Sequence, residues 1–268
     1  MKKKFFGINL IKSFIINLDR DKERYEFCSN QFLENKCLIN RFNAFNGSKI
    51  TDKEFDQFCI ERPLFNKNKG KNGMACHLSH EFLWNKVVEE RLDCAAIFED
   101  DIWLSPTIAH LLNDTKWLPE DFDIIRLEAG TNRILLSSDF SSVFDRKLHC
   151  LLSNAWGTAG YIISKKGAKK ILSFPNSVRK SNDWNLYASD LGSIISKQLI
   201  KYQVHPAVCI QDKFYDIKNI RFKSSLETYN SSIFQNSFLY KLHSLKDKNL
   251  RYFANRLNRN LIKNEFKL

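Results

Sequence analysis

The stretch from Cys94 to Asp101 joins five small or apolar residues to three consecutive acids, Glu99, Asp100 and Asp101. The apolar run predicts a buried strand, and the acids follow where that strand should emerge. Crowded carboxylates repel one another and lose hydration, so stability alone rarely favours three of them at a strand end. A divalent cation would offset that cost, and ligands in open α/β sheets bind outside the carboxyl ends of strands. We therefore expect a metal site for a phosphate-bearing substrate; the alternative is an acidic turn that caps the next helix.

Cys76 and His80 lie four residues apart in a segment with helical periodicity, which is a spacing that metal ligands use. No second ligand pair follows them, so the sequence does not favour zinc. Ser79 and His80 could suggest a hydrolase, but adjacent residues on a helix point apart, which disfavours that interpretation.

The composition fits one globular domain of moderate size with an appendage: the 268 residues are 43% hydrophobic and 13% aromatic. The formal charge of +12 allows nucleic acid, an anionic membrane surface or phosphorylated small molecules as partners. The seven cysteines are an odd number without a C-x-x-C pair, which is typical of reduced thiols in a cytosolic protein. No signal peptide and no spanning segment are expected.

Predicted strands and helices alternate along the chain, which indicates an α/β sheet with helices on its faces. We expect strands at 13–18, 39–45, 94–98, 122–127, 155–164 and 204–210. We expect helices that end near 34, begin at 51, and span 74–92 and 165–174, with a polar loop at 66–73. After about residue 223, apolar residues recur at three- and four-residue steps on a basic background, so the predicted units are 1–222 and a basic amphipathic helical extension, 223–268.

Four more segments stand in order around the acidic strand: 17–24, 43–47, 73–80 and 156–161. Together with 98–101 they resemble glycosyltransferase family 25, which includes bacterial lipooligosaccharide galactosyltransferases. The resemblance covers roughly residues 12–215. It implies a GT-A type fold, in which a mixed sheet flanked by helices binds a nucleotide sugar, with a UDP-sugar donor and Mn²⁺ or Mg²⁺.

The resemblance assigns roles to the acids. Asp101 would ligate the metal, Glu99 would contact the metal or the ribose, and Asp100 would point at the sugar. A metal there would neutralise the charge that develops on the departing diphosphate. His205, which leads a late strand into Pro206, would complete the metal shell.

The resemblance also implies a donor site. Its candidate residues are Asn17, Leu18, Arg20, Arg24, Ala44, Gly47, Ser79, His80 and Gln211. For three of them a structural alternative stays open: Arg24 could pair with Asp21, Gly47 could serve a plain turn, and His80 could be a satisfied core histidine.

Inversion at the sugar needs a base that takes the proton of the acceptor hydroxyl. Asp183 matches the place of such a base in GT-A enzymes, and Asp190 is its nearest competitor. The segment 156–161 would form the wall on the acceptor side, or alternatively it packs as an ordinary strand.

The leading hypothesis is an inverting, metal-dependent transferase that moves galactose from a UDP-sugar to a lipooligosaccharide core. The protein would be cytoplasmic, and its basic tail would dock on the inner face of the cytoplasmic membrane or pack on the domain. The alternatives are a non-enzymatic protein that binds nucleic acid or membrane, a metal-dependent phosphohydrolase, and a degenerate family member. No nucleic-acid reader motif occurs, so nucleic acid is not the expected partner.

Overall fold

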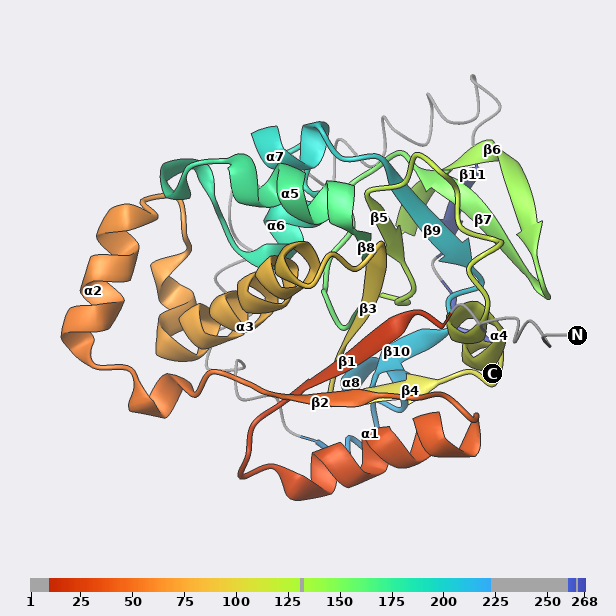
Figure 1. The fold of residues 1–268 in the computed structure, drawn as a ribbon, viewed down its shortest axis with the longest axis horizontal. Coiled ribbons are helices and arrows are strands. Elements are labelled where there is room, and N and C mark those ends of the chain that lie inside the picture. The colour runs from red at the N-terminus through yellow and green to blue at the C-terminus, as the bar shows by residue number, and fades with distance from the viewer. Residues whose placement is uncertain (1–9, 131–132, 223–259, 264) are drawn as a thin grey trace, which may run out of the picture.

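The computed structural model describes residues 10–130, 133–222, 260–263 and 265–268 as an α/β fold (Figure 1). The strands are β1 Lys12–Asn17, β2 Asn40–Asn43, β3 Cys94–Glu99, β4 Ile102–Leu104, β5 Ile124–Arg126, β6 Arg133–Val143, β7 Arg146–Leu151, β8 Gly160–Ser164, β9 Lys201–His205, β10 Cys209–Gln211 and β11 Asn260–Lys263. The α-helices are α1 Lys22–Glu34, α2 Asp52–Glu61, α3 Gly70–Glu89, α4 Ile108–Asn113, α5 Lys165–Ser173, α6 Asn182–Tyr187, α7 Ile194–Lys197 and α8 Asp212–Tyr215. Short 3₁₀ turns lie at Gly47–Lys49, Lys67–Lys69 and Asn176–Val178.

A mixed sheet with the order β11-β6-β7-β9-β5-β8-β3-β1-β2 forms the centre, which confirms the predicted fold class. The neighbours of β1 are both parallel to it, whereas β8 runs antiparallel between β3 and β5. Because β1 and β3 are parallel and adjacent, the segments that follow Asn17 and Glu99 emerge at one edge of the sheet. That edge carries the acids.

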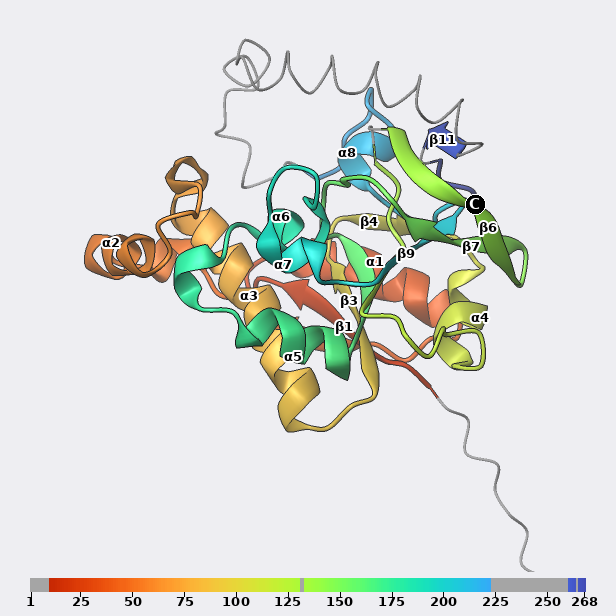
Figure 2. The same cartoon turned by 90° about the horizontal axis from the view of Figure 1, so that it is seen from above.

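Alternating side chains of the buried strands pack into two hydrophobic layers. Ile15 packs in one layer with Phe32 of α1 and Leu111 of α4. Ile16 packs in the other layer, which contains Trp84 of α3 and Ile171 of α5. Figure 1 accordingly shows α1 on one side of the sheet and α3 and α5 on the other, and Figure 2 shows α2 and α4 at opposite ends of the molecule.

Two expectations about the chain's local structure need correction. Residues 66–73, expected to be a loop, form a 3₁₀ turn and the first turn of α3, and Gly70 with a φ of 59° lies at the junction between them. Residues 260–263, expected to be helical, form β11 because their backbone pairs antiparallel with the edge of β6. The rest of the predicted helical extension, 223–259, lies outside the described residues.

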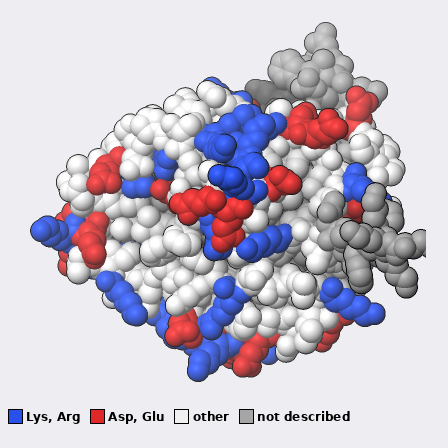
Figure 3. Space-filling model, in the orientation of Figure 1, with Lys and Arg blue, Asp and Glu red and all other residues white. Residues whose placement is uncertain are grey.

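Basic side chains gather over the region of α5 on the face shown in Figure 3, beside acidic ones. Ion pairs account for part of this mixture, since Lys165 lies 3.5 Å from Asp93 and Lys170 lies 2.6 Å from Asp123. Among the helices of the described ranges, none is both long and apolar enough to cross a membrane.

Candidate active site

The acids at the end of β3 are each held by a different set of partners. Asp100 Oδ2 accepts a hydrogen bond from Asn17 Nδ2 at 2.6 Å, and Asp100 Oδ1 accepts one from Arg24 Nε at 2.8 Å. The same guanidinium reaches Asp101 Oδ2 at 3.2 Å. Arg24 therefore pairs with the acidic turn, with Asp21 as a weaker charge partner, and its expected contact with the nucleotide stays a prediction.

Gln211 joins the other two carboxylates. Its Nε2 lies 3.2 Å from Glu99 Oε2 and 3.3 Å from Asp101 Oδ1. Burial raises the pKa of Asp101 to about 6, and the negative charge of Glu99 adds to that rise. Burial acts in the same direction on Glu99, but the His80 ring and a 2.9 Å hydrogen bond from Thr158 Oγ1 outweigh it and lower the pKa of Glu99. A buried carboxylate, Asp101, and a partly buried one, Glu99, are thus held together at the sheet edge.

A cavity of about 230 Å³ opens on one side of these acids, and we call it the Arg24 cavity. Most of the predicted donor residues line it: Leu18, Arg24, Ala44, Gly47, Ser79, His80, Asp100, Asp101, Glu99 and Gln211. The structure thus brings together residues from the ends of β1, β2 and β3 and from α3.

Two of these lining residues have structural partners of their own. The Ser79 hydroxyl donates to Ala75 O and accepts from Phe45 N, so it fixes the turn that follows β2. A side chain at Gly47 would collide with Asn72 of α3, so the absence of a Cβ at this position permits the helix to approach the turn.

A second cavity of about 280 Å³, here the Trp156 cavity, lies on the other side of Glu99. It is lined by Trp156, Glu128 and Asp183, among others, and it shares Cys76, Glu99, Gln211 and Lys213 with the Arg24 cavity. Asp183 Oδ1 accepts hydrogen bonds from Ser181 Oγ and Trp184 N at 2.7 and 3.0 Å. The two cavities therefore meet at Glu99 and Gln211.

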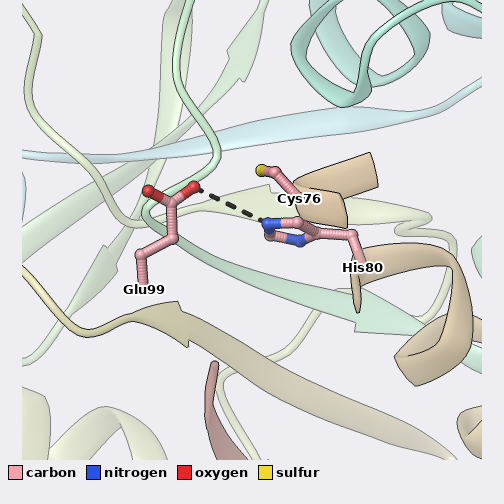
Figure 4. A group of neighbouring side chains, drawn as sticks. All are labelled: Cys76, His80 and Glu99. Carbon is pink, nitrogen blue, oxygen red and sulfur yellow. Dashed lines mark ion pairs between the residues drawn. The ribbon is translucent and has the colours of Figure 1, made fainter. Parts of the chain in front are cut away.

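Cys76 and His80 project from α3 toward Glu99 (Figure 4). His80 Nε2 lies 3.6 Å from Glu99 Oε1, and His80 Nδ1 lies 2.8 Å from the hydroxyl oxygen of Tyr161. That oxygen also accepts a hydrogen bond from Trp84 Nε1 at 2.8 Å. His80 is thus both a hydrogen-bonded core residue and a neighbour of the acidic group.

The sequence model of Glycosyltransferase family 25 (LPS biosynthesis protein) matches residues 10–190. The chain belongs to glycosyltransferase family 25. This confirms the resemblance and identifies the chain as a glycosyltransferase of a family that is described by its role in LPS biosynthesis. The non-enzymatic alternative is therefore set aside.

Three curated relatives show how far the likeness extends. The chain is 27% identical to "Lipooligosaccharide biosynthesis protein lex-1" of Haemophilus influenzae, over 76% of this chain and 78% of the relative. It is 29% identical to "Lipooligosaccharide biosynthesis protein lic2B" of the same species, over 81% and 82%. It is 30% identical to "Lacto-N-neotetraose biosynthesis glycosyltransferase LgtB" of Neisseria meningitidis, over 70% and 69%.

Three residues that the likeness to family 25 suggested lie outside both cavities. Asn17 is buried behind Asp100, where its Oδ1 accepts from Arg41. Arg20 is half exposed and approaches Asp21 and Asn46. His205 ends β9, which is separated from β3 by β5 and β8, so three strand spacings, or about 14 Å, lie between their ends.

The expectation that His205 completes the metal shell is therefore corrected. Its neighbours are His149, whose ring centroid is 6.3 Å away, and the charged groups of Glu265, Lys147 and Arg146. Burial lowers the pKa of His205, and His149, Lys147 and Arg146 add to that shift against the opposing charge of Glu265.

Family motifs read from the sequence missed several residues of the site. Glu128 lies two residues after β5, where its Oε2 accepts from Ala159 N at 3.0 Å, and burial raises its pKa to about 8. Gly157, at a φ of 89°, has no room for a side chain because Glu128 occupies the space. A charged residue directly after an apolar strand was the available signal for Glu128. Lys213 lies in the short helix α8 after β10, and no motif in the sequence pointed to it.

Proposed function

We propose that this glycosyltransferase moves a hexose, with galactose as the first candidate, from a UDP-sugar to a lipooligosaccharide acceptor with inversion. The observation that carries the proposal is the junction of the two cavities at Glu99 and Gln211. A donor in the Arg24 cavity and an acceptor in the Trp156 cavity would meet there. The printed names of the relatives support an oligosaccharide acceptor.

The residues present fit a divalent cation. Glu99 and Asp101 offer carboxylate oxygens that Gln211 holds close together, and their like charges disfavour ionisation of Asp101. Hard oxygen donors of this kind suit Mn²⁺ or Mg²⁺. Such an ion would neutralise the charge that develops on the leaving diphosphate.

The chain's own residues would orient the donor. Both oxygens of Asp100 are engaged by Asn17 and Arg24, so we assign it to holding Arg24 against Asp101 rather than to contacting the sugar. Arg24 and Lys213 add positive charge to a cavity that would receive a diphosphate.

On the other side of the junction, Trp156 offers an aromatic face to the C–H surface of an acceptor sugar. In the proposed step, the acceptor oxygen bonds to the anomeric carbon while the bond from that carbon to the UDP oxygen breaks. Asp183 takes the proton of the acceptor hydroxyl.

The test is UDP release from a panel of UDP-sugars in Mn²⁺, compared with a chelator, for the native chain, Asp101→Ala and the exposed control Asp139→Ala. We expect turnover of one donor, loss of at least 100-fold in the chelator and in Asp101→Ala, and native rates in the control. A turnover rate that is the same with and without the chelator, and the same in the native chain and in Asp101→Ala, would overturn the metal assignment. Absence of turnover with every donor, even with a lipooligosaccharide extract present, would overturn the proposed donor class.

A further inference from the structure

Three side chains of unlike chemistry converge between the two cavities. Cys76 and His80 stand four residues apart on one face of α3, and Glu99 ends β3 opposite them (Figure 4). Their ligand atoms, a sulfur, an imidazole nitrogen and a carboxylate oxygen, all lie within 4.8 Å of one another. Among the described residues this is the one group of three such side chains with this spacing. The sequence alone showed two of the three, because Glu99 reaches the group only through the fold.

The His80 ring points one nitrogen into this group. Nε2 is fully buried, and within the described residues it makes no hydrogen bond; its charged neighbour is Glu99 Oε1 at 3.6 Å. On the other side of the ring, the Tyr161 hydroxyl oxygen can accept a hydrogen from Nδ1. In that tautomer Nε2 presents its lone pair toward Glu99 and Cys76, so an arriving ion replaces the proton that Nε2 carries when it pairs with Glu99. A metal-binding histidine is commonly oriented by such a hydrogen bond from its second nitrogen.

We propose that Cys76, His80 and Glu99 form a site for Zn²⁺ or a similar borderline-soft cation, distinct in its donor set from the oxygen site at Asp101. Thiolate, imidazole and carboxylate are the donors that Zn²⁺ takes in tetrahedral sites, whereas Mn²⁺ and Mg²⁺ prefer oxygen. Cys76 and Glu99 line both cavities, which gives the ion an entry path and leaves a fourth position for water.

Binding must displace a proton from Cys76. Burial raises the pKa of this thiol well above its ordinary value, so the thiol is protonated before the ion arrives. The S–H bond breaks, a metal–sulfur bond forms, and the proton passes to solvent.

Glu99 links the two sites. An ion on Cys76 and His80 would draw the Glu99 carboxylate away from Gln211 and Asp101. Zn²⁺ would therefore inhibit sugar transfer while Mn²⁺ is present. This consequence rests on the proposed function, whereas the binding of the ion does not.

Binding is tested on the full chain with Co²⁺ as a spectroscopic probe and with Zn²⁺ competed against a chromogenic chelator. We expect about one ion per chain, a sulfur-to-cobalt charge-transfer band, and loss of that band with at least tenfold weaker Zn²⁺ binding in Cys76→Ser. Cys94→Ser, at the other end of β3, is the matched control. It should keep both the charge-transfer band and the native Zn²⁺ affinity. Circular dichroism checks that each variant is folded. A band that survives in Cys76→Ser, or that disappears equally in Cys94→Ser, overturns the site.

The activity arm separates this inference from the proposed function. We expect micromolar Zn²⁺ to inhibit donor turnover in the native chain and at least tenfold higher Zn²⁺ to be needed in Cys76→Ser. Equal inhibition of both proteins overturns the inference and leaves the proposed transfer standing. A cobalt band without turnover of any donor supports the site and overturns the transfer.

Discussion

Besides Glu99, two carboxyl groups face the Trp156 cavity, and their surroundings give them different chemistry. Glu128 is almost fully buried, and the desolvation of its charged form raises its pKa to about 8, so it is protonated at neutral pH. Asp183 is partly exposed beside Ser181 and Lys69. A protonated carboxyl cannot accept a proton, so Asp183 is the better base of the two.

At this residue scale we predict that Asp183→Asn lowers kcat by 10²- to 10⁴-fold, as expected when a general base is removed. The KM for the donor should change by less than about threefold, because Asp183 lies outside the Arg24 cavity. Steady-state kinetics with a lipooligosaccharide acceptor make the measurement, and Asp190→Asn serves as the matched control. Native kcat in Asp183→Asn, or an equal loss in Asp190→Asn, would remove Asp183 from this role.

At the scale of elements, one partly buried carboxylate of α3, Glu81, ties two other segments to this helix. Glu81 lies 3.2 Å from Arg62, which follows α2, 2.9 Å from Arg179, which follows the last 3₁₀ turn, and 3.0 Å from His77 within α3. Arg62 and Arg179 are both buried. The network therefore orients α3, the helix that presents Cys76 and His80.

This network predicts a pH dependence of stability. Burial alone would raise the pKa of Glu81, but the His77 hydrogen bond and the charges of Arg179 and Arg62 lower it from 4.5 to about 2. The folded-state pKa is depressed, so the contribution is fully present above pH 4.5 and is lost as pH falls toward 2. The shift corresponds to roughly 3 kcal/mol of unfolding free energy.

The measurement is denaturant unfolding of the native chain, Glu81→Gln and the exposed control Glu89→Gln between pH 7 and pH 3. We expect Glu81→Gln to be destabilised by about 3 kcal/mol at pH 7, because two buried guanidinium groups lose their partner, and by less at pH 3. Glu89→Gln should follow the native chain. A difference between native and Glu81→Gln proteins that does not shrink on acidification would contradict the assigned pKa shift.

The sequence predicts some of the helices and strands and misses others. Strands with continuous apolar runs, such as β1 and β3, were placed from their composition, and the Thr51 capping box marked the start of α2. The long strand β6 was missed because half of it is exposed and polar and shows no clear alternation. His205 was misplaced for a different reason: chain order gives no distance across a sheet, and β9 joins on the far side of β5.

At the scale of the whole molecule, the end of the chain returns to the sheet near the site. Ala207 N donates to Glu265 O at 2.8 Å, and Lys267 N donates to Ala207 O at 3.3 Å. The buried Arg146 of β7 donates to Lys267 O and to Ser105 Oγ at 2.8 and 2.7 Å. Ala207 stands four residues before Gln211, the end of β10. The last residues of the chain therefore support the strand whose Gln211 contacts Glu99 and Asp101.

We therefore predict that Arg146→Met loosens this support. Removal of two buried hydrogen bonds should lower the unfolding free energy by about 2–4 kcal/mol, since Ser105 and the Lys267 carbonyl lose their donor. Hydrogen exchange should accelerate more at the amides of Ala207 and Lys267 than at the amides of β3. Lys147→Ala changes the exposed neighbour on the same strand. It should leave the unfolding free energy within about 0.5 kcal/mol of native and the two exchange rates unchanged. Unchanged exchange at Lys267 in Arg146→Met would show that the backbone contacts, at Ala207 and between β11 and β6, hold the chain end without Arg146.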